Sequence, residues 1–112
     1  MVTTQFGKKS EDEAVKFLEN NNFIIIERNF YAKKMGEIDI IAQKNNTLHF
    51  IEVKSSSTKK YQPVYNLSPR KLKKMINSTQ YYLKIKNLNL SFCLDAIIIT
   101  DGDIEFLENI TL

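Results

Sequence analysis

Residues 36–54, GEIDIIAQKNNTLHFIEVK, contain two stretches rich in isoleucine and other apolar residues on either side of Asn45 and Asn46. Asparagine tolerates the left-handed backbone conformation that a two-residue hairpin turn requires. The pattern therefore predicts two antiparallel strands, over residues 37–43 and 48–54, joined directly at this turn.

This hairpin gathers charged side chains. With Asn45 and Asn46 as its turn, Asp39 lies opposite Glu52 and Glu37 lies opposite Lys54, all on one face. Directly opposed Cβ atoms are about 4.5–5.5 Å apart, so two facing carboxylates destabilise the strand pair unless a cation compensates. The apolar side chains between the charged ones face the other way and supply one side of a core: Ile38, Ile40, Ile51 and Val53.

Asp39 and Glu52 are candidate ligands of a divalent cation. Mg²⁺ prefers oxygen ligands and usually keeps several waters, so two carboxylates and substrate phosphate oxygens suffice. Lys54 emerges two residues after Glu52 on the same face, where its ammonium would steer the attacking water and neutralise charge on the phosphorane. The pattern indicates metal-dependent phosphodiester hydrolysis. The alternative is a purely structural lattice of cross-strand salt bridges, with Glu37 paired to Lys54.

A first helix is predicted over residues 10–20, where Ala14, Phe17 and Leu18 recur at helical spacing. Glu11 projects beside Ala14 and Leu18 on the apolar stripe. An acid aimed inward suits a supporting role at the metal. The alternative is a carboxylate that favours the helix dipole in the first turn and extends to water.

The remaining pattern completes an α/β fold. A second helix is expected to begin at Pro69, with Ser68 as its N-cap, and to run to about residue 86. Further strands are expected over residues 23–30, 91–100 and 103–107. This order of elements predicts a central mixed sheet flanked by helices, in which the second helix allows strands 48–54 and 91–100 to run parallel.

The positive charge is unevenly distributed. The net charge is +3, but residues 55–94 contain no Asp or Glu and eight of the sixteen Lys and Arg residues. Such a basic region attracts polyanions, and phosphate neutralisation is the main non-specific contribution to nucleic-acid binding. The alternative is a solvated lysine-rich surface. The candidate nucleic-acid-binding residues are Lys33, Lys34, Lys59, Lys60, Arg70, Lys71 and Lys74.

Length and composition set further bounds. A chain of 112 residues with 43% hydrophobic residues indicates one domain over residues 1–112. The single cysteine, Cys93, lies in an apolar run, which is typical of a buried, unreactive thiol in a reducing cytoplasm. No cationic leader and no apolar run of ~18 residues is found, so a cytoplasmic protein is expected. His49 points away from the carboxylates and has no second His or Cys at ligand spacing, which favours a core histidine over a zinc ligand.

Several short motifs recur in a known combination: Ser10-Glu11-Asp12, Arg28-Asn29, residues 36–41, residues 50–54 and Lys71. They resemble the YraN family of uncharacterised bacterial proteins, within the PD-(D/E)XK nuclease superfamily. The resemblance implies a restriction-endonuclease-like core, similar to archaeal Holliday-junction resolvases. It implies Asp39, Glu52 and Lys54 as the catalytic trio, Glu11 as a supporting acid and Mg²⁺ or Mn²⁺ as the cofactor. It also suggests a homodimer.

Three functional hypotheses follow. The first is a metal-dependent endonuclease acting on DNA, with branched or damaged DNA as substrate. The second is a non-catalytic nucleic-acid-binding module that serves as an adaptor in DNA processing or uptake. The third, a purely structural interaction domain, does not account for the complete acidic trio.

Overall fold

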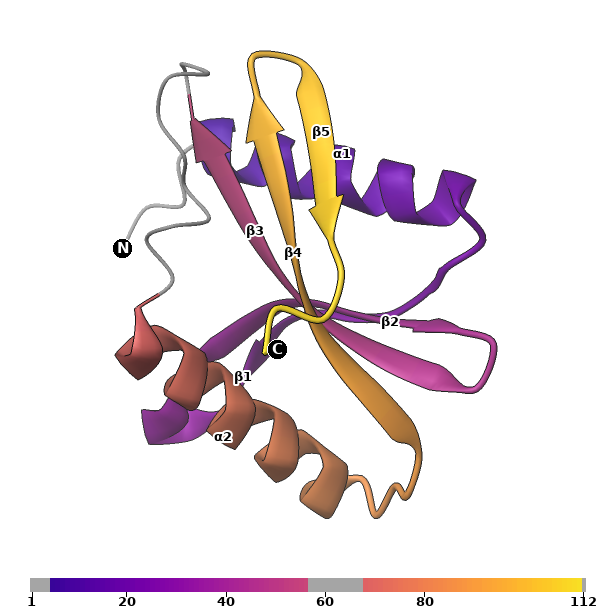
Figure 1. Ribbon diagram of the computed structural model, residues 1–112, viewed down its shortest axis with the longest axis vertical. Helices are drawn as coiled ribbons and strands as arrows, with labels where there is room; N and C mark the ends of the chain where they lie inside the picture. The colour runs from indigo at the N-terminus through magenta and orange to yellow at the C-terminus, as the bar shows by residue number, and fades with distance from the viewer. Residues whose placement is uncertain (1–4, 57–67, 112) are drawn as a thin grey trace.

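The computed structural model describes residues 5–56 and 68–111, which form two α-helices, a short 3₁₀ helix and five strands (Figure 1). In chain order the elements are α1 (Gln5–Asn20), β1 (Ile24–Tyr31), η1 (Lys33–Met35), β2 (Glu37–Lys44), β3 (Thr47–Ser56), α2 (Pro69–Ile85), β4 (Ser91–Thr100) and β5 (Asp103–Leu107). Helix α1 begins at Gln5, five residues before the predicted start. The apolar periodicity that supports the prediction starts only near Ala14, so the first turns carry no sequence signal.

The five strands form one mixed sheet in the order β1-β2-β3-β4-β5. Neighbouring strands are antiparallel except for β3 and β4, which run parallel. The parallel pair needs a crossover, and α2 supplies it. Ser68 caps α2 by accepting a hydrogen bond from the Lys71 backbone N–H at 3.2 Å, and Pro69 takes the first helical position.

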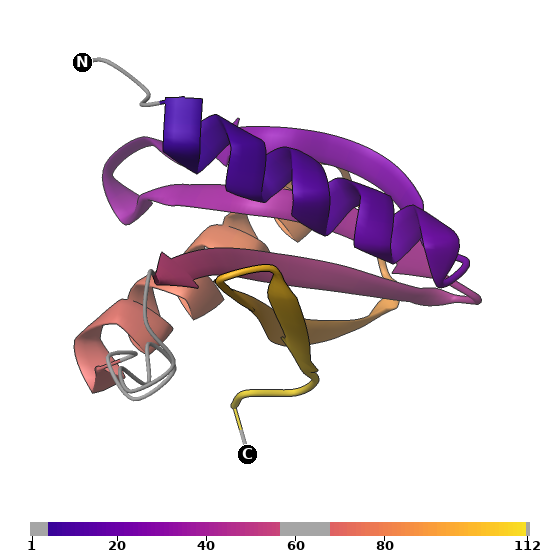
Figure 2. The same cartoon turned by 90° about the horizontal axis from the view of Figure 1, so that it is seen from above.

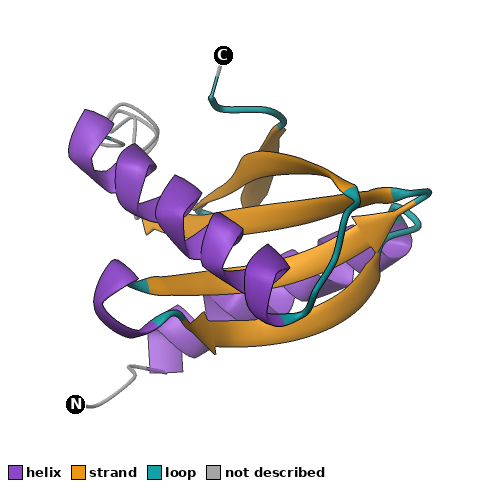
Figure 3. Cartoon of the chain, turned by 90° about the horizontal axis from the view of Figure 1, so that it is seen from below, coloured by secondary structure: helices purple, strands orange, loops and turns teal. Residues whose placement is uncertain are grey.

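The two α-helices cover opposite faces of the sheet (Figures 2 and 3). On the α1 side, Ala14 and Leu18 pack against Ile40, Ile51 and Ile97. On the α2 side, Tyr82 packs among apolar side chains of β1 to β4, which include Phe30, Ile41, Leu48, Phe50 and Leu94. The expected α/β fold with a central mixed sheet is confirmed, and it is consistent with a restriction-endonuclease-like core.

The predicted β2–β3 hairpin is confirmed over its turn half. Lys44 pairs with Thr47 and Ile40 pairs with Ile51, and Asn45 adopts the left-handed conformation with φ of 56°. The regular pairing stops at Ile40 and Ile51, and the two strands diverge from there (Figure 1). The hairpin is therefore a closed ladder at its turn and a fork at its open end.

The fork changes three expectations. Asp39 is not paired with Glu52 in the ladder, because the regular pairing ends at Ile40 and Ile51. Glu37 does not pair with Lys54; it pairs with Tyr31 of β1 instead, because β2 has left β3 at that point. Ile38 belongs to the core on the α2 side, whereas Ile40 packs on the α1 side. Residues that are two apart on a regular strand point to the same face. The backbone of β2 therefore twists at Asp39, and this turns the side chains of Ile38 and Ile40 to opposite faces.

Neither α-helix in the described ranges is long and apolar enough to cross a membrane.

Candidate active site

The fork between β2 and β3 positions Asp39. Its Oδ2 accepts a hydrogen bond from the backbone N–H of Val53 at 2.8 Å. The side chain thus takes the place of a backbone acceptor beyond the end of the regular β2–β3 pairing, and satisfies a group that would otherwise lack a partner in the sheet. The carboxylate is fixed between the strands, next to Glu52.

Asp39 is in an unfavourable environment for a charged group. Its pKa is raised from 3.8 to about 7, chiefly by burial and next by the negative charge of Glu52, with smaller contributions from Glu11 and Glu37. The hydrogen bond from Val53 acts in the opposite direction. Two carboxylates whose charges oppose each other in a partly buried site are typical of a cation site or of acid–base chemistry.

Lys54 lies beside Glu52 on β3. Its Nζ is 3.2 Å from Glu52 Oε2, and the two side chains are 25% and 24% exposed. Burial lowers the pKa of Lys54, but the adjacent Glu52 carboxylate acts in the opposite direction, and the net pKa is raised. Lys54 therefore carries its positive charge at neutral pH. The structure brings the predicted trio of Asp39, Glu52 and Lys54 to one place, with Glu52 rather than Glu37 as the lysine's partner.

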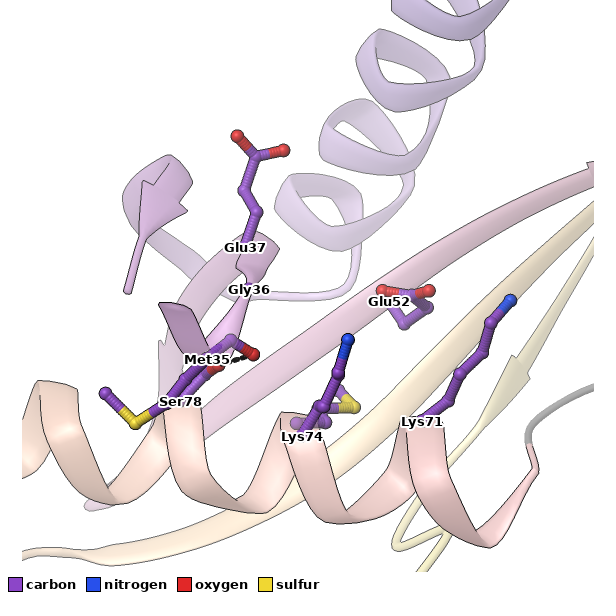
Figure 4. Close-up of a pocket in the computed structure, with 8 residues that line it drawn as sticks. Met35, Gly36, Glu37, Glu52, Lys71, Lys74 and Ser78 are labelled. Carbon is purple, nitrogen blue, oxygen red and sulfur yellow. Dashed lines mark hydrogen bonds between the residues drawn. The ribbon is translucent and has the colours of Figure 1, made fainter. Parts of the chain in front are cut away.

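A pocket of about 160 Å³ opens beside Glu52, between β3, the start of β2 and helix α2 (Figure 4). Lys71 and Lys74 extend from α2 along the same side as Glu52, whereas the carboxylate of Glu37 points away from both lysines. Ser78 donates a hydrogen bond to the Met35 carbonyl at 3.1 Å, which ties α2 to the floor of the pocket. Lys71 and Lys74 therefore line the same pocket as Glu52, a candidate metal ligand.

Glu11 reaches this region from α1. Its Oε1 accepts hydrogen bonds from Arg28 Nη2 at 2.9 Å and from Asn29 Nδ2 at 3.0 Å, and its side chain is only 15% exposed. The inward orientation predicted for Glu11 is confirmed. Its charge contributes to the raised pKa of Asp39, so the two carboxylates are electrostatically coupled.

The other predicted cations are dispersed. Lys33 and Lys34 lie on η1 and Arg70 lies in the first turn of α2, all exposed to solvent. Lys59 and Lys60 fall outside the described residues. Of the predicted nucleic-acid-binding residues that the structure describes, Lys71 and Lys74 share the pocket with Glu52.

Sequence analysis missed a buried polar cluster on the α1 side of the sheet. His49 is buried against Phe23, as expected of a core histidine, but its Nδ1 lies 2.5 Å from Oδ2 of the fully buried Asp95. Cys93 donates to Asp95 Oδ1 at 3.0 Å, and the backbone N–H of Asn109 donates to the same oxygen at 2.9 Å. The cluster depends on the parallel register of β3 and β4, which sets His49 beside Cys93. This register cannot be predicted from the local spacing of residues.

The donor groups of the two clusters differ. Among the described residues, His49, Cys93 and Asp95 are the one group of three potential metal-ligating side chains whose ligand atoms all lie within 4.8 Å of one another. Hydrogen bonds within the group already satisfy these side chains. Burial chiefly raises the pKa of the Cys93 thiol to about 12, which favours its protonated form. Asp39 and Glu52 offer two carboxylates whose mutual repulsion a cation would relieve. That donor set fits Mg²⁺ or Mn²⁺, which keep several waters of their own.

Comparison with known proteins places the chain in a family. Residues 10–99 match the family described as Uncharacterised protein family UPF0102. A UPF0102 protein from Sulfurovum sp. is 58% identical over 107 residues, covering 96% of this chain and 94% of the relative. Another from Wolinella succinogenes is 52% identical over 106 residues, covering 95% of each chain. A third, from Aliarcobacter butzleri, is 50% identical over 112 residues, covering 99% of this chain and 100% of the relative. These matches confirm the resemblance to the YraN proteins, and the chain belongs to the UPF0102 family.

Proposed function

We propose that this protein is a metal-dependent endonuclease of the PD-(D/E)XK superfamily, and that it hydrolyses phosphodiester bonds in DNA. The observation that carries the proposal is the fork in the β2–β3 hairpin. At that fork Asp39 and Glu52 repel each other, Lys54 is held beside Glu52, and two further lysines line the adjoining pocket. A structural salt-bridge lattice would not require the raised pKa of Asp39.

Asp39 and Glu52 would hold Mg²⁺ or Mn²⁺. When bound, such an ion supplies Lewis-acid catalysis and a nucleophilic water at neutral pH. The remaining work falls to the protein's own side chains. Lys54, fixed by its contact with Glu52, presents a permanent positive charge that stabilises the negative charge developing on the phosphate oxygens.

Lys71 and Lys74 serve the substrate backbone. Both project from α2 into the pocket beside Glu52, where phosphate groups flanking the scissile bond would neutralise them. Contacts to phosphate position a nucleic acid without reading its sequence. The geometry therefore favours recognition of backbone shape, which suits branched or damaged DNA.

The test is cleavage of labelled single-stranded, duplex and four-way-junction DNA, and of matched RNA, in the presence of Mg²⁺ or Mn²⁺. Wild type is compared with Glu52→Gln and Lys54→Ala purified in the same way, and with Glu105→Gln as a matched control on an exposed position of β5. We expect cleavage by wild type and Glu105→Gln that EDTA abolishes, and none by the two site variants once circular dichroism has shown that they are folded.

The basic surface of α2 supports a second candidate, a non-catalytic nucleic-acid-binding module. Arg70, Lys71, Lys73 and Lys74 are all exposed at the start of the helix. If wild type binds DNA in a salt-sensitive manner, fails to cut any of the substrates, and Glu52→Gln binds equally well, the binding module replaces the nuclease.

A further inference from the structure

Three hydrogen bonds converge on one oxygen of Glu11. Arg28 donates to Oε1 through Nε at 3.1 Å and through Nη2 at 2.9 Å, and Asn29 donates to the same atom through Nδ2 at 3.0 Å. Among the described residues none donates to the other oxygen, Oε2. A carboxylate held by one oxygen has a fixed orientation and keeps the second oxygen available.

The backbone of β1 is distorted where these donors lie. Consecutive side chains of a regular strand point to opposite faces, yet Arg28 and Asn29 both reach Glu11. Asn29 adopts a left-handed conformation with φ of 54°, which breaks the alternation. This conformation is costly for most residues and tolerable for asparagine, so Asn29 meets two requirements at once.

Strand register brings the same donors to the candidate active site. Arg28 pairs with Ile40 and Phe30 pairs with Ile38, so Asn29 occupies the position opposite Asp39. Arg28 is itself anchored by Asp12, whose Oδ1 lies 2.6 Å from Nη2, and this hydrogen bond is the largest cause of the raised pKa of Arg28. The chain of contacts runs from Asp12 through Arg28 to Glu11, whose negative charge acts on Asp39.

We propose that Arg28 and Asn29 are positioning residues, which hold Glu11 by Oε1 and leave Oε2 available to a cation held by Asp39 and Glu52. The inference rests on the proposed function, because it assigns Glu11 to the same metal site. This positioning role differs from a purely structural contact between α1 and β1. A structural contact would need neither three hydrogen bonds to one oxygen of Glu11 nor the distorted backbone at Asn29. Groups that orient a metal ligand in this way influence metal affinity as well as stability.

Two substitutions isolate the orientation of Glu11. Asn29→Gly removes the amide and keeps the backbone conformation, because glycine adopts positive φ freely. Arg28→Lys keeps the charge and loses the two-nitrogen contact. Mn²⁺ affinity is measured by isothermal titration calorimetry without DNA, and the Mn²⁺ dependence of cleavage is measured in parallel. Glu19→Gln, an exposed position at the far end of α1, is the control for mutation on this helix.

We expect each substitution to weaken Mn²⁺ binding by about tenfold, and Glu19→Gln to leave it unchanged. Because Asn29 acts through Glu11, the double variant Glu11→Gln/Asn29→Gly should bind no more weakly than Glu11→Gln alone. Unchanged Mn²⁺ affinity in Asn29→Gly and Arg28→Lys, with lowered melting temperatures, would overturn the positioning role and leave a structural tie. If wild type binds no Mn²⁺, the proposed function fails and the positioning role with it.

Discussion

The carboxyl group of Asp39 opposes the folding of the metal-free protein at neutral pH. Its pKa is raised from 3.8 to about 7, so the folded state binds a proton that the unfolded chain has already released over this range. The stability that the protonated form contributes is complete below pH 3.8 and is lost as the pH rises through about 7. Each unit of pKa shift corresponds to about 1.4 kcal/mol.

Asp39→Asn should therefore stabilise the metal-free protein at alkaline pH. The amide has no charge to desolvate, and its oxygen can still accept the Val53 hydrogen bond. We expect the free energy of unfolding to rise by roughly 1–3 kcal/mol near pH 8, and by clearly less near pH 5, where the carboxyl group of the folded protein is still protonated. Urea denaturation in EDTA at both values measures this difference, and an equal effect at the two pH values would contradict the raised pKa.

Asp95 is a structural counterpart on the opposite side of the sheet. It is fully buried and satisfies His49, Cys93 and the backbone of Asn109, so one residue joins β3, β4 and the C-terminal segment. Asp95→Ala leaves these three groups without their shared acceptor, and we expect a loss of about 3 kcal/mol in the free energy of unfolding. Glu105→Ala at an exposed position should cost less than about 0.5 kcal/mol in the same urea titration.

This prediction separates the two clusters. His49 is three residues before Glu52 on β3 and faces the α1 core, so Asp95→Ala should leave the cleavage rate per folded molecule unchanged. If folded Asp95→Ala instead loses metal-dependent cleavage, the buried cluster contributes to catalysis.

Among the elements, α2 carries an electrostatic conflict. Lys71 lies in its first turn and Lys74 in its second, where the positive end of the helix dipole disfavours cations. No acidic residue occupies the first turn to compensate. A helix arranged for stability alone would place its lysines at the other end, as Lys84 is.

The double variant Lys71→Gln/Lys74→Gln should separate stability from binding. We expect unfolding to become less favourable by about 0.5 kcal/mol, since the dipole conflict is relieved. We expect DNA affinity to fall, and the slope of log affinity against log salt to decrease by about 2, one unit for each lost phosphate contact. Fluorescence anisotropy over a salt series measures both quantities for binding.

The control is Lys84→Gln/Lys86→Gln, which makes the same change in charge near the other end of α2. It should alter the salt slope much less, because these lysines lie away from the pocket. Equal losses for the two double variants would show that net charge, and not the pocket, governs binding.

At the scale of the whole molecule, local pattern predicted the elements and long-range register decided the site. The Asn45 turn, the Ser68 cap and the apolar run of β4 each depend on neighbouring residues, and each was recognised. The end of the β2–β3 ladder at Ile40 depends on how β1 and β3 compete for β2, which no local pattern encodes. The Glu37–Lys54 pairing was therefore wrong, and Asp95 was missed because its partners are brought together by the parallel pairing of β3 with β4.

Metal binding should couple to the stability of the entire fold. The proposed ligands Asp39 and Glu52 come from β2 and β3, two neighbouring interior strands of the sheet, so a cation between them would bind the folded chain in preference to the unfolded one. A ligand present at 100 times its dissociation constant stabilises a protein by about 2.7 kcal/mol. For a domain of this size that corresponds to a rise in melting temperature on the order of 10 °C.

The rise should depend on pH in the direction that Asp39 dictates. A metal ligand must be ionised, and a proton competes with the cation below the pKa of about 7. We expect Mn²⁺ to raise the melting temperature of wild type strongly near pH 8 and weakly near pH 5.5, with roughly a tenfold loss of apparent affinity per pH unit below the pKa. Differential scanning fluorimetry with and without EDTA measures the shift.

Glu52→Gln should lose the rise in melting temperature at both pH values and Glu105→Gln should retain it. An equal rise in Glu52→Gln would place the bound ion elsewhere in the molecule, with the carboxylate of Asp95 as the next site to substitute.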